Sequence, residues 1–233
     1  AKNYAEKISK LAWKLRTKFF IKKTSVELAI EEAKKMKHGL IVISDSDSTT
    51  SGATGDNTCV LKELIKQKID FPALLSIVDP QVVKEALFAG IGNKIICEIG
   101  GKQDNVYSEP VHIQAVIKKF TDGHFVIKGG HIGTISVDMG DTVVLKTGTI
   151  DILVSEKIGP VYEQTVYKHA GLDPQDYRVV VVKSPVGFRA AYEPIAAKII
   201  LVDCPGFSAS DLSIYKYENI PHPTYPFDKE ISW

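Results

Sequence analysis

Two kinds of hydrophobic pattern divide this chain. Short, continuous apolar runs, typical of strands buried on both faces, occur at 40–44, 73–78, 94–99, 150–155, 178–183 and 198–202. Segments with helical periodicity lie between most of them, at about 25–37, 56–68, 80–90, 160–170 and 187–196. Because parallel strands need crossover connections, this alternation predicts an α/β fold, with a mostly parallel sheet and flanking helices in a layered sandwich.

Local signals place the starts and the inner faces of several helices. Thr24 and Glu27 form a capping-box pattern before the helix at 25–37, and Asp79 followed by Pro80 predicts a second helix start. In the helix at 56–68 the residues expected to face inward are Val60, Leu61, Leu64 and Ile65. The strands at 40–44, 73–78 and 94–99 are therefore expected to pair in parallel, as in βαβαβ units.

The pattern changes over residues 106–147, where apolar and polar positions alternate. Glycine-containing turns such as Asp122-Gly123 and Gly140-Asp141 interrupt the alternation. Period-two alternation between such turns is typical of antiparallel strands with one solvated face. We therefore expect an antiparallel β-meander at about 106–147 that interrupts the α/β sandwich.

The two ends of the chain differ from this α/β core. Residues 1–38 are expected to be a helical segment, with the α/β domain following at 39–233. An apolar stripe at helical spacing runs along the first helix and consists of Ile8, Leu11, Ala12, Leu15 and Phe19. Such a stripe needs a partner surface, so we expect this sequence to be part of a longer protein. The Pro- and aromatic-rich tail after Pro205 is expected to pack across the surface.

Composition excludes some classes of partner. The 29 basic and 28 acidic residues nearly cancel, which gives no electrostatic reason to expect nucleic acid or a membrane surface as a partner. No apolar run approaches the roughly 18–20 residues that span a bilayer, and the charged N-terminal sequence does not resemble a signal peptide. The three cysteines are far apart and form no CxxC motif. These features predict reduced thiols and a cytoplasmic location.

A polar loop at 45–57 is the first candidate site. It follows the buried run at 40–44 and precedes a helix, and open α/β sheets bind ligands at such strand ends. The candidate substrate-binding residues in it are Asp47, Ser51, Gly52, Gly55, Asp56 and Asn57. Backbone amides there could hold an anion, but the loop lacks the lysine of a Walker A motif. The alternative is a polar loop whose Asp and Ser side chains bond to its own backbone.

A second candidate loop follows the run at 178–183. Lys183 and Ser184 end that strand, and Arg189 is placed to grip a carboxylate near the next helix start. The alternative is an arginine that pairs with a carboxylate of its own domain, such as Asp203. Both loops follow predicted parallel strands, so we expect them to converge at one edge of the sheet.

No metal site or catalytic nucleophile is indicated. The six histidines, His38, His112, His124, His131, His169 and His222, show no known metal-ligand spacing. No GxSxG motif suggests a serine hydrolase, and Cys59 is expected to pack rather than react. We assign neither a catalytic residue nor a metal ligand to this chain.

An ordered set of motifs resembles the C-terminal half of the microcystinase-C-like (MlrC-like) metallopeptidases. The resemblance extends over about residues 1–228 and includes the helix around Trp13 and Arg16. Its pieces are Asp47 with Gly52, Gly55-Asp56-Asn57-Thr58, Asp79-Pro80, Ala89-Gly90-Ile91-Gly92, Gly100-Gly101-Lys102, Lys183-Ser184, Phe188-Arg189-Ala190, Pro194-Ile195-Ala196 and Asp203-Cys204-Pro205-Gly206.

This resemblance implies an enzyme of roughly twice this length, whose N-terminal domain carries the zinc ligands and hydrolyses peptide bonds in small peptides. The implied partners are thus an N-terminal zinc-binding domain of the same protein and a small peptide or amide substrate. The family's zinc-ligand motifs are absent here, so the cofactor is assigned to that domain. One departure is the stretch 48–51, which reads Ser-Thr-Thr-Ser where the family usually has Asn-Pro-Gly-Gly. That difference puts the family's substrate preference in doubt for this chain.

The leading hypothesis is a C-terminal, substrate-positioning domain of a zinc-dependent peptidase or amide hydrolase, inactive by itself. One alternative is a stand-alone α/β module that binds a small anion or nucleotide through the loop at 45–57. Another is a purely structural or dimerising domain. Homo-oligomerisation is compatible with each of these.

Overall fold

The structure is a computed structural model that describes residues 1–128, 133–228 and 230–231. The chain separates into two compact units. Unit 1 combines residues 1–23 with residues 212–233, and unit 2 comprises residues 24–211. The predicted boundary between a helical segment at residues 1–38 and an α/β domain at 39–233 stays a prediction.

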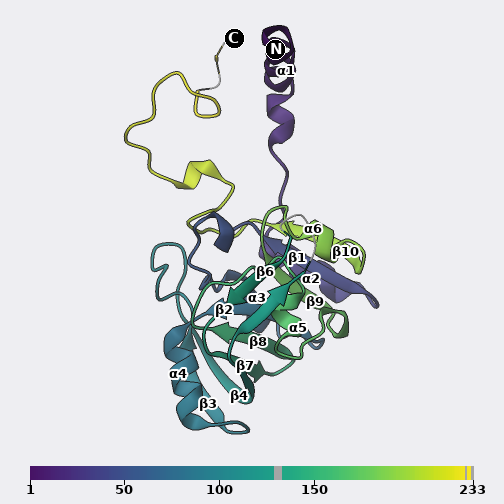
Figure 1. The fold of residues 1–233 in the computed structure, drawn as a ribbon, viewed down its shortest axis with the longest axis vertical. Coiled ribbons are helices and arrows are strands. Elements are labelled where there is room, and N and C mark those ends of the chain that lie inside the picture. Colours follow the sequence, from purple (N-terminus) through teal and green to yellow (C-terminus); the bar gives the residue numbers. More distant parts are fainter. Residues whose placement is uncertain (129–132, 229, 232–233) are drawn as a thin grey trace. The chain divides into compact units, whose positions relative to one another are not determined.

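Unit 2 is built on a sheet that has eight strands within the described residues, in the order β10–β1–β9–β2–β8–β7–β4–β3 (Figure 1). Neighbours from β10 to β8 are parallel, and neighbours from β8 to β3 are antiparallel. The predicted α/β sheet with an antiparallel insertion is confirmed. The strands are β1 Leu40–Asp45, β2 Ala73–Val78, β3 Lys94–Ile99, β4 Val111–Thr121, β7 Thr142–Thr147, β8 Ile150–Ser155, β9 Val179–Lys183 and β10 Ala196–Val202.

The parallel strands are predominantly apolar because helices or loops cover both of their faces. Alternate residues of β1 enter different cores: Ile41 and Ile43 pack with α2, α3 and α4, whereas Leu40 and Val42 pack on the opposite face. The helices of the first face are α2 Val26–Lys35, α3 Cys59–Lys66 and α4 Pro80–Ala89. The second face is covered by α5 Thr165–Lys168, α6 Arg189–Tyr192 and the loops beside them. The layered sandwich follows from this arrangement.

The direction predicted for the strand at 94–99 is wrong. It was expected to pair in parallel, but β3 pairs antiparallel with β4 at the end of the sheet. Lys94, Ile96 and Glu98 are exposed while the residues between them are buried. This alternation marks a strand with one solvated face, which is common in antiparallel sheets and rare in parallel ones.

Several helix details also differ from the predictions. Ser25, not Thr24, caps α2 by accepting a hydrogen bond from Leu28 N at 3.3 Å, and Thr24 instead bonds to β10 through Leu201 O. Ile65 of α3 is 37% exposed rather than buried. The helices expected at 160–170 and 187–196 shrink to α5 and α6, the latter because Pro194 cannot continue a helix.

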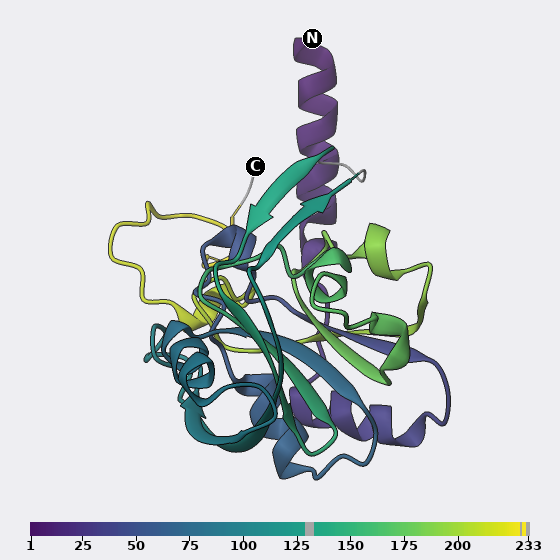
Figure 2. The same cartoon turned by 60° about the horizontal axis from the view of Figure 1, so that its bottom comes forward.

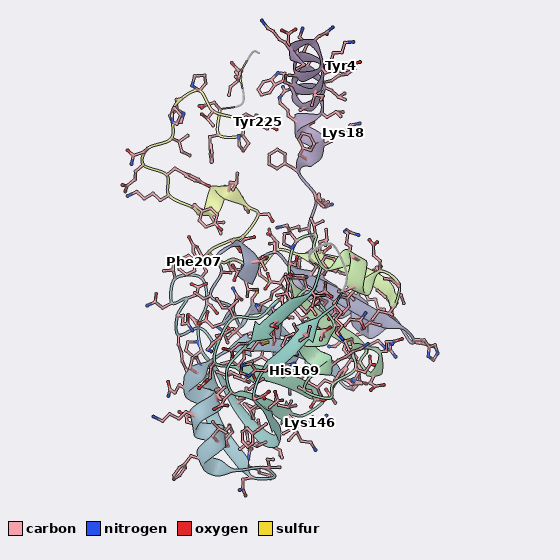
Figure 3. The ribbon with its side chains drawn as sticks, in the orientation of Figure 1. Tyr4, Lys18, Lys146, His169, Phe207 and Tyr225 are labelled. Carbon is pink, nitrogen blue, oxygen red and sulfur yellow. The ribbon has the colours of Figure 1, made fainter. Side chains whose placement is uncertain are left out.

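The predicted meander divides between two sheets. Its strands β4 and β7 join the main sheet, whereas β5 His124–Ile127 and β6 Ile135–Asp138 form a separate antiparallel hairpin, the teal pair of arrows in Figure 2. The ring of Phe125 in β5 stacks on His169, labelled in Figure 3, with centroids 4.5 Å apart. This contact packs the hairpin against the end of α5.

Unit 1 contains the predicted N-terminal helix, α1 Lys2–Leu15, followed by a 3₁₀ turn at Arg16–Phe19. Arg16 lies over the Trp13 ring at 4.5 Å, and Tyr225 meets the same ring edge-on at 5.8 Å. These aromatic residues line an apolar groove of about 420 Å³ within this unit. The described helices include none that is both long and apolar enough to cross a membrane.

Candidate functional site

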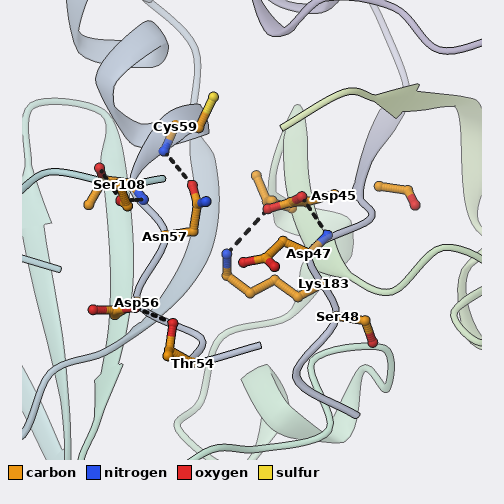
Figure 4. A network of polar contacts seen from close by, with 12 residues as sticks. Asp45, Asp47, Ser48, Thr54, Asp56, Asn57, Cys59, Ser108 and Lys183 are labelled. Carbon is orange, nitrogen blue, oxygen red and sulfur yellow. Dashed lines mark hydrogen bonds and ion pairs between the residues drawn. The ribbon is translucent and has the colours of Figure 1, made fainter. Parts of the chain in front are cut away.

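The candidate site begins where β1 and β9 end, at neighbouring positions of one sheet edge. Asp45 lies opposite Lys183 in the parallel register, and Lys183 Nζ is 3.3 Å from Asp45 Oδ2 (Figure 4). Ser44 Oγ also donates a 2.6 Å hydrogen bond to Ser184 O. The two loops that were predicted to converge therefore lie side by side.

Asp47 is the most unusual group in this network because it is fully buried and only half satisfied. Its Oδ1 accepts a hydrogen bond from Ser208 N at 3.1 Å. Its Oδ2 is buried with no hydrogen-bond partner among the described residues. Burial, the largest influence, raises the pKa of the Asp47 carboxyl, and the nearby negative charge of Asp45 acts in the same direction.

Lys183 supplies the positive charge of the network. Burial of its ammonium opposes protonation, but the neighbouring carboxylates of Asp45 and Asp47 outweigh that effect and raise the pKa of Lys183. In Figure 4 its amino group points between Asp45 and Asp47. Lys183 is thus ion-paired with Asp45 and also interacts electrostatically with the buried carboxyl group of Asp47.

A segment after β10 covers this network. Ser208 bonds to Asp47 as described above, and Ser208 Oγ accepts a 2.7 Å hydrogen bond from Ser48 N. Gly206 allows close approach, because a Cβ atom at that position would lie 2.3 Å from Asp47 Cγ. Asn57 joins the segment to α3: its Nδ2 donates to Pro205 O at 2.6 Å and its Oδ1 accepts from Cys59 N at 2.9 Å.

The thiols of Cys59 and Cys204 at this junction affect each other's pKa. The Cys204 thiol donates a hydrogen bond to Cys59, which lowers the pKa of Cys59. The same hydrogen bond, together with burial, raises the pKa of Cys204. Cys59 is only partly buried, so the sequence-based expectation of a packed residue holds more fully for Cys204.

Asp56 is buried and organises the loop at 100–104. Its Oδ2 accepts hydrogen bonds from Lys102 N at 2.9 Å and Gln103 N at 2.7 Å, and its Oδ1 accepts one from the Thr54 hydroxyl. Gly100 has a φ of +65° and leaves no room for a Cβ, which would lie 2.5 Å from Asp56 O. Asp56 thus binds this protein's own backbone, the alternative that the sequence had left open for the loop.

Only some of the predicted substrate-binding residues are accessible. Ser51 and Gly52 are exposed at the tip of the loop, where Gly52 adopts a left-handed conformation with a φ of +99°. Arg189 is half-buried and pairs with Glu193 at 2.6 Å, not with Asp203. The buried members of the predicted set are Asp47, Gly55, Asp56, Asn57, Lys183 and Ser184. Their part in substrate binding stays a prediction.

Several members of the network were not identified as site residues from the sequence. Asp79 was recognised only as a helix cap, and it does accept from Val82 N, but its carboxylate also pairs with Lys102 at 3.0 Å. Ser208 carries no motif that could have identified it. Gly206 stands in the motif around Asp203 that supported the family resemblance, so its spacing from Asp47 was the available signal.

A metal ion is not accommodated by the described residues. No group of three or more His, Cys, Asp or Glu side chains in them is placed to hold one, and His131 lies outside the described residues. The zinc chemistry implied by the resemblance therefore has no ligand set in this part of the structure.

The region that matches a known protein family includes the residues of this network. The family model described as "MlrC C-terminus" matches residues 43–219, from within β1 to beyond Ser208. The chain belongs to the MlrC C-terminus family. Microcystinase C from a Sphingomonas species is 25% identical to it over 189 residues. That match covers 81% of this chain but only 36% of the relative.

A solved structure has the same fold as this MlrC C-terminus chain. It is the crystal structure of a "Putative metallopeptidase" from Mesorhizobium sp. BNC1, with a TM-score of 0.85 and 23% sequence identity. The match covers 97% of this chain and 45% of that one. The chain thus spans less than half the length of either relative.

Proposed function

We propose that this chain is the C-terminal, substrate-positioning part of a zinc-dependent peptidase or amide hydrolase. The observation that carries the proposal is the family match over residues 43–219, which contains the polar network at the ends of β1 and β9. The catalytic zinc is proposed to lie in an N-terminal domain of the same protein, outside this chain. The family relationship and the name of the metallopeptidase-like structure support this division.

Within the proposed enzyme, the exposed residues beside the carboxyl ends of β1 and β9 would contact the substrate. We call Ser51, Gly52 and Arg189 the rim. Ser51 offers an exposed hydroxyl group and Gly52 an exposed backbone, which suit the polar backbone of a small peptide. Arg189 could exchange its exposed partner Glu193 for a substrate carboxylate at little cost, because exposed ion pairs contribute only about 0–1 kcal/mol. The buried network beneath, with Asp45, Asp47 and Lys183, would hold this rim in place.

Two further features support the proposal. The apolar residues of α1, among them Ile8 and Leu11, are exposed, as expected for a helix that packs on another domain. The three free cysteines agree with the proposed cytoplasmic location. In the complete enzyme, the zinc ion would activate water and polarise the scissile carbonyl.

The test measures zinc content and hydrolysis of small linear peptides by the purified 233-residue chain, alone and mixed with the proposed N-terminal domain. We expect neither bound zinc nor activity in the chain alone, and activity once both parts are present. Stoichiometric zinc with activity in the chain alone would overturn the division of labour. A mixture no more active than the N-terminal domain by itself would overturn the positioning role.

The same assay examines the rim. Arg189→Met should raise KM for peptides with a free carboxylate by about tenfold, the loss of roughly one charge-assisted contact, and should leave kcat largely unchanged. Lys198→Met is the matched control, because Lys198 is a partly exposed cation that pairs with Glu32 on α2. Equal effects of the two substitutions would remove Arg189 from the substrate contacts.

A further inference from the structure

The strand β3 forms an open edge of unit 2. Within the described residues it pairs with β4 on one side, and no strand pairs with its other side. Figure 1 shows β3 and α4 together at this end of the sheet. An open edge presents backbone N–H and C=O groups to a further strand, and proteins usually protect such an edge.

The exposed face of β3 carries an apolar residue between two oppositely charged ones. Its three exposed residues are Lys94, Ile96 and Glu98, so opposite charges flank a central apolar side chain that is 66% exposed. When the strand is read in reverse, the charges change places and the isoleucine stays in the centre. The pattern is therefore complementary to itself in an antiparallel arrangement.

We propose that β3 pairs antiparallel with β3 of a second copy of this chain, about a two-fold axis at Ile96. In that register Lys94 lies opposite Glu98 of the second copy, Glu98 lies opposite Lys94, and the two Ile96 side chains meet. Opposite charges and apolar pairs directly across an antiparallel ladder are stabilising. A register shifted so that Lys94 or Glu98 met its own copy would bring like charges together.

The neighbouring helix favours a second copy over a lone peptide strand. α4 packs on the buried face of β3, where Val82, Val83 and Ala86 share a core with Ile95 and Cys97. The proposed axis is perpendicular to the sheet, so it places both α4 helices on the same face of the joined sheet. The exposed apolar side chains of α4 are Leu87, at 43%, and Phe88, at 96%. A second α4 alongside would offer them an apolar surface.

The opposite edge of the sheet explains why pairing would stop at a dimer. At β10, Thr24 N donates to Leu201 O at 2.9 Å and Thr24 O accepts from Asp203 N at 3.1 Å. The chain entering α2 thus covers the end of β10, whereas no backbone segment among the described residues bonds to the outer edge of β3. An interface that uses the same strand on both copies is closed, so it forms dimers and not fibres.

Cross-linking tests the register directly. Residues opposite each other in antiparallel strands have Cα atoms about 4.5–5.5 Å apart, within the range of about 4.4–6.8 Å that a disulfide spans. Ile96→Cys should therefore form a disulfide-linked dimer under mild oxidation at micromolar concentration. Leu28→Cys, at a 55% exposed position on α2, and the unsubstituted chain with its own three cysteines should stay uncross-linked. Absence of the Ile96→Cys dimer would overturn the proposal.

Charge reversal tests the same contact without oxidation. Sedimentation equilibrium should show that Lys94→Glu and Glu98→Lys each weaken the dimer by about tenfold, because each places like charges across both symmetry-related pairs. The double variant K94E/E98K should recover an affinity within about threefold of the unsubstituted chain. Recovery also shows that loss of the 2.8 Å Glu98–His112 contact is not the cause of weakening.

Three outcomes would refute β3 pairing. One is a chain that stays monomeric at all accessible concentrations. Another is a double variant no better than the single ones. The third is association that ignores the β3 substitutions but is abolished by Leu11→Lys on α1, which would assign the interface to unit 1.

Discussion

The two halves of the main sheet treat their charged residues in opposite ways. In the parallel half, β1 and β9 end in Asp45 and Lys183, which are almost completely buried and paired with each other. In the antiparallel half, hydrogen-bonded polar pairs such as Glu98 with His112 lie at the surface. Coverage explains the difference, because both faces of the parallel strands are packed and their buried charged groups lie near the strand ends. The half with buried charges is the one proposed to serve the substrate, and the half with a solvated face offers an edge for association.

Removing the buried ammonium group of Lys183 should cause the largest loss of unfolding free energy. Lys183→Met would leave Asp45 and Asp47 buried without their ammonium partner, a change that costs about 3–5 kcal/mol of unfolding free energy. Lys146→Met is the control from the antiparallel half, where Lys146, labelled in Figure 3, pairs with Asp151 while remaining 39% exposed. The Asp151 side chain is only 13% exposed, but it also accepts a 2.8 Å hydrogen bond from the Tyr177 hydroxyl, so this loss should be about 1 kcal/mol. Urea unfolding measures both losses, and losses of similar size would contradict the contrast drawn between the halves.

A smaller loss of unfolding free energy is expected when a side chain is added to the segment at 205–208, which packs over Asp47. Gly206→Ala would place a Cβ 2.3 Å from Asp47 Cγ, which is held in place by Ser208, so the segment at 205–208 must shift. We expect a loss of about 1–3 kcal/mol, the usual range for overpacking. In Gly187→Ala the nearest atom, Ser184 Oγ, would lie 3.2 Å away, and a loss of roughly 0.5 kcal/mol is expected. Thermal melting compares the two variants. Equal melting temperatures would show that the segment at 205–208 does not pack tightly on Asp47.

The smallest expected effect is on the pH dependence of stability, which should have opposite signs for Asp47 and Asp138. Burial raises the pKa of Asp47 above its ordinary value of 3.8, so ionisation of this group opposes folding as the pH rises through its folded-state pKa. Asp138 of the β5–β6 hairpin behaves in the opposite way, because a hydrogen bond from Lys157 lowers its pKa. Its ionised form stabilises the fold above the ordinary value, and that stability is lost as the pH falls through the lowered pKa.

Asparagine variants isolate these two contributions. Relative to the unsubstituted chain, Asp47→Asn should gain stability as the pH rises from about 4 to 8, and Asp138→Asn should lose stability as the pH rises from about 2 to 4. Asn at position 47 keeps the acceptor for Ser208 N, so the comparison concerns charge and not the hydrogen bond. Chemical unfolding at several pH values gives both differences, and the same sign for both would contradict the assignment.

The parallel half could be predicted well from the sequence because burial on both faces leaves a plain signal. The runs at 73–78 and 150–155 coincide with β2 and β8, and Asp79 caps α4 as its Asp-Pro pair indicated. The strand at 94–99 was misjudged because a short apolar run does not reveal its direction. Its alternating pattern was present, but the exposed isoleucine at position 96 hid it.

For the candidate site, the sequence could predict which loops lie together but not which partners their side chains bind. Both loops follow predicted parallel strands, which indicated that the loops after β1 and β9 would lie at the same edge of the sheet, and they do. Whether a polar side chain faces solvent or its own backbone depends on segments distant in sequence, such as Ser208 above Asp47 and Lys102 beside Asp56. Periodicity carries no information about those contacts, so Asp56 and Asn57 resembled ligand-binding residues while bonding to this chain's own backbone.

The distance along the chain between the partners in this network has a consequence for how the protein is made. Asp45 and Lys183 are 138 residues apart, and Asp47 and Ser208 are 161 residues apart. During synthesis, a nascent chain that has released β1 still lacks the lysine that neutralises Asp45 and the segment that covers Asp47. Asp45 therefore lacks its ion-pair partner until Lys183 has emerged from the ribosome, and Asp47 lacks its cover until Ser208 has emerged; contacts of such long range form slowly. The protection of Asp47 from water thus reports that synthesis and folding of unit 2 are complete.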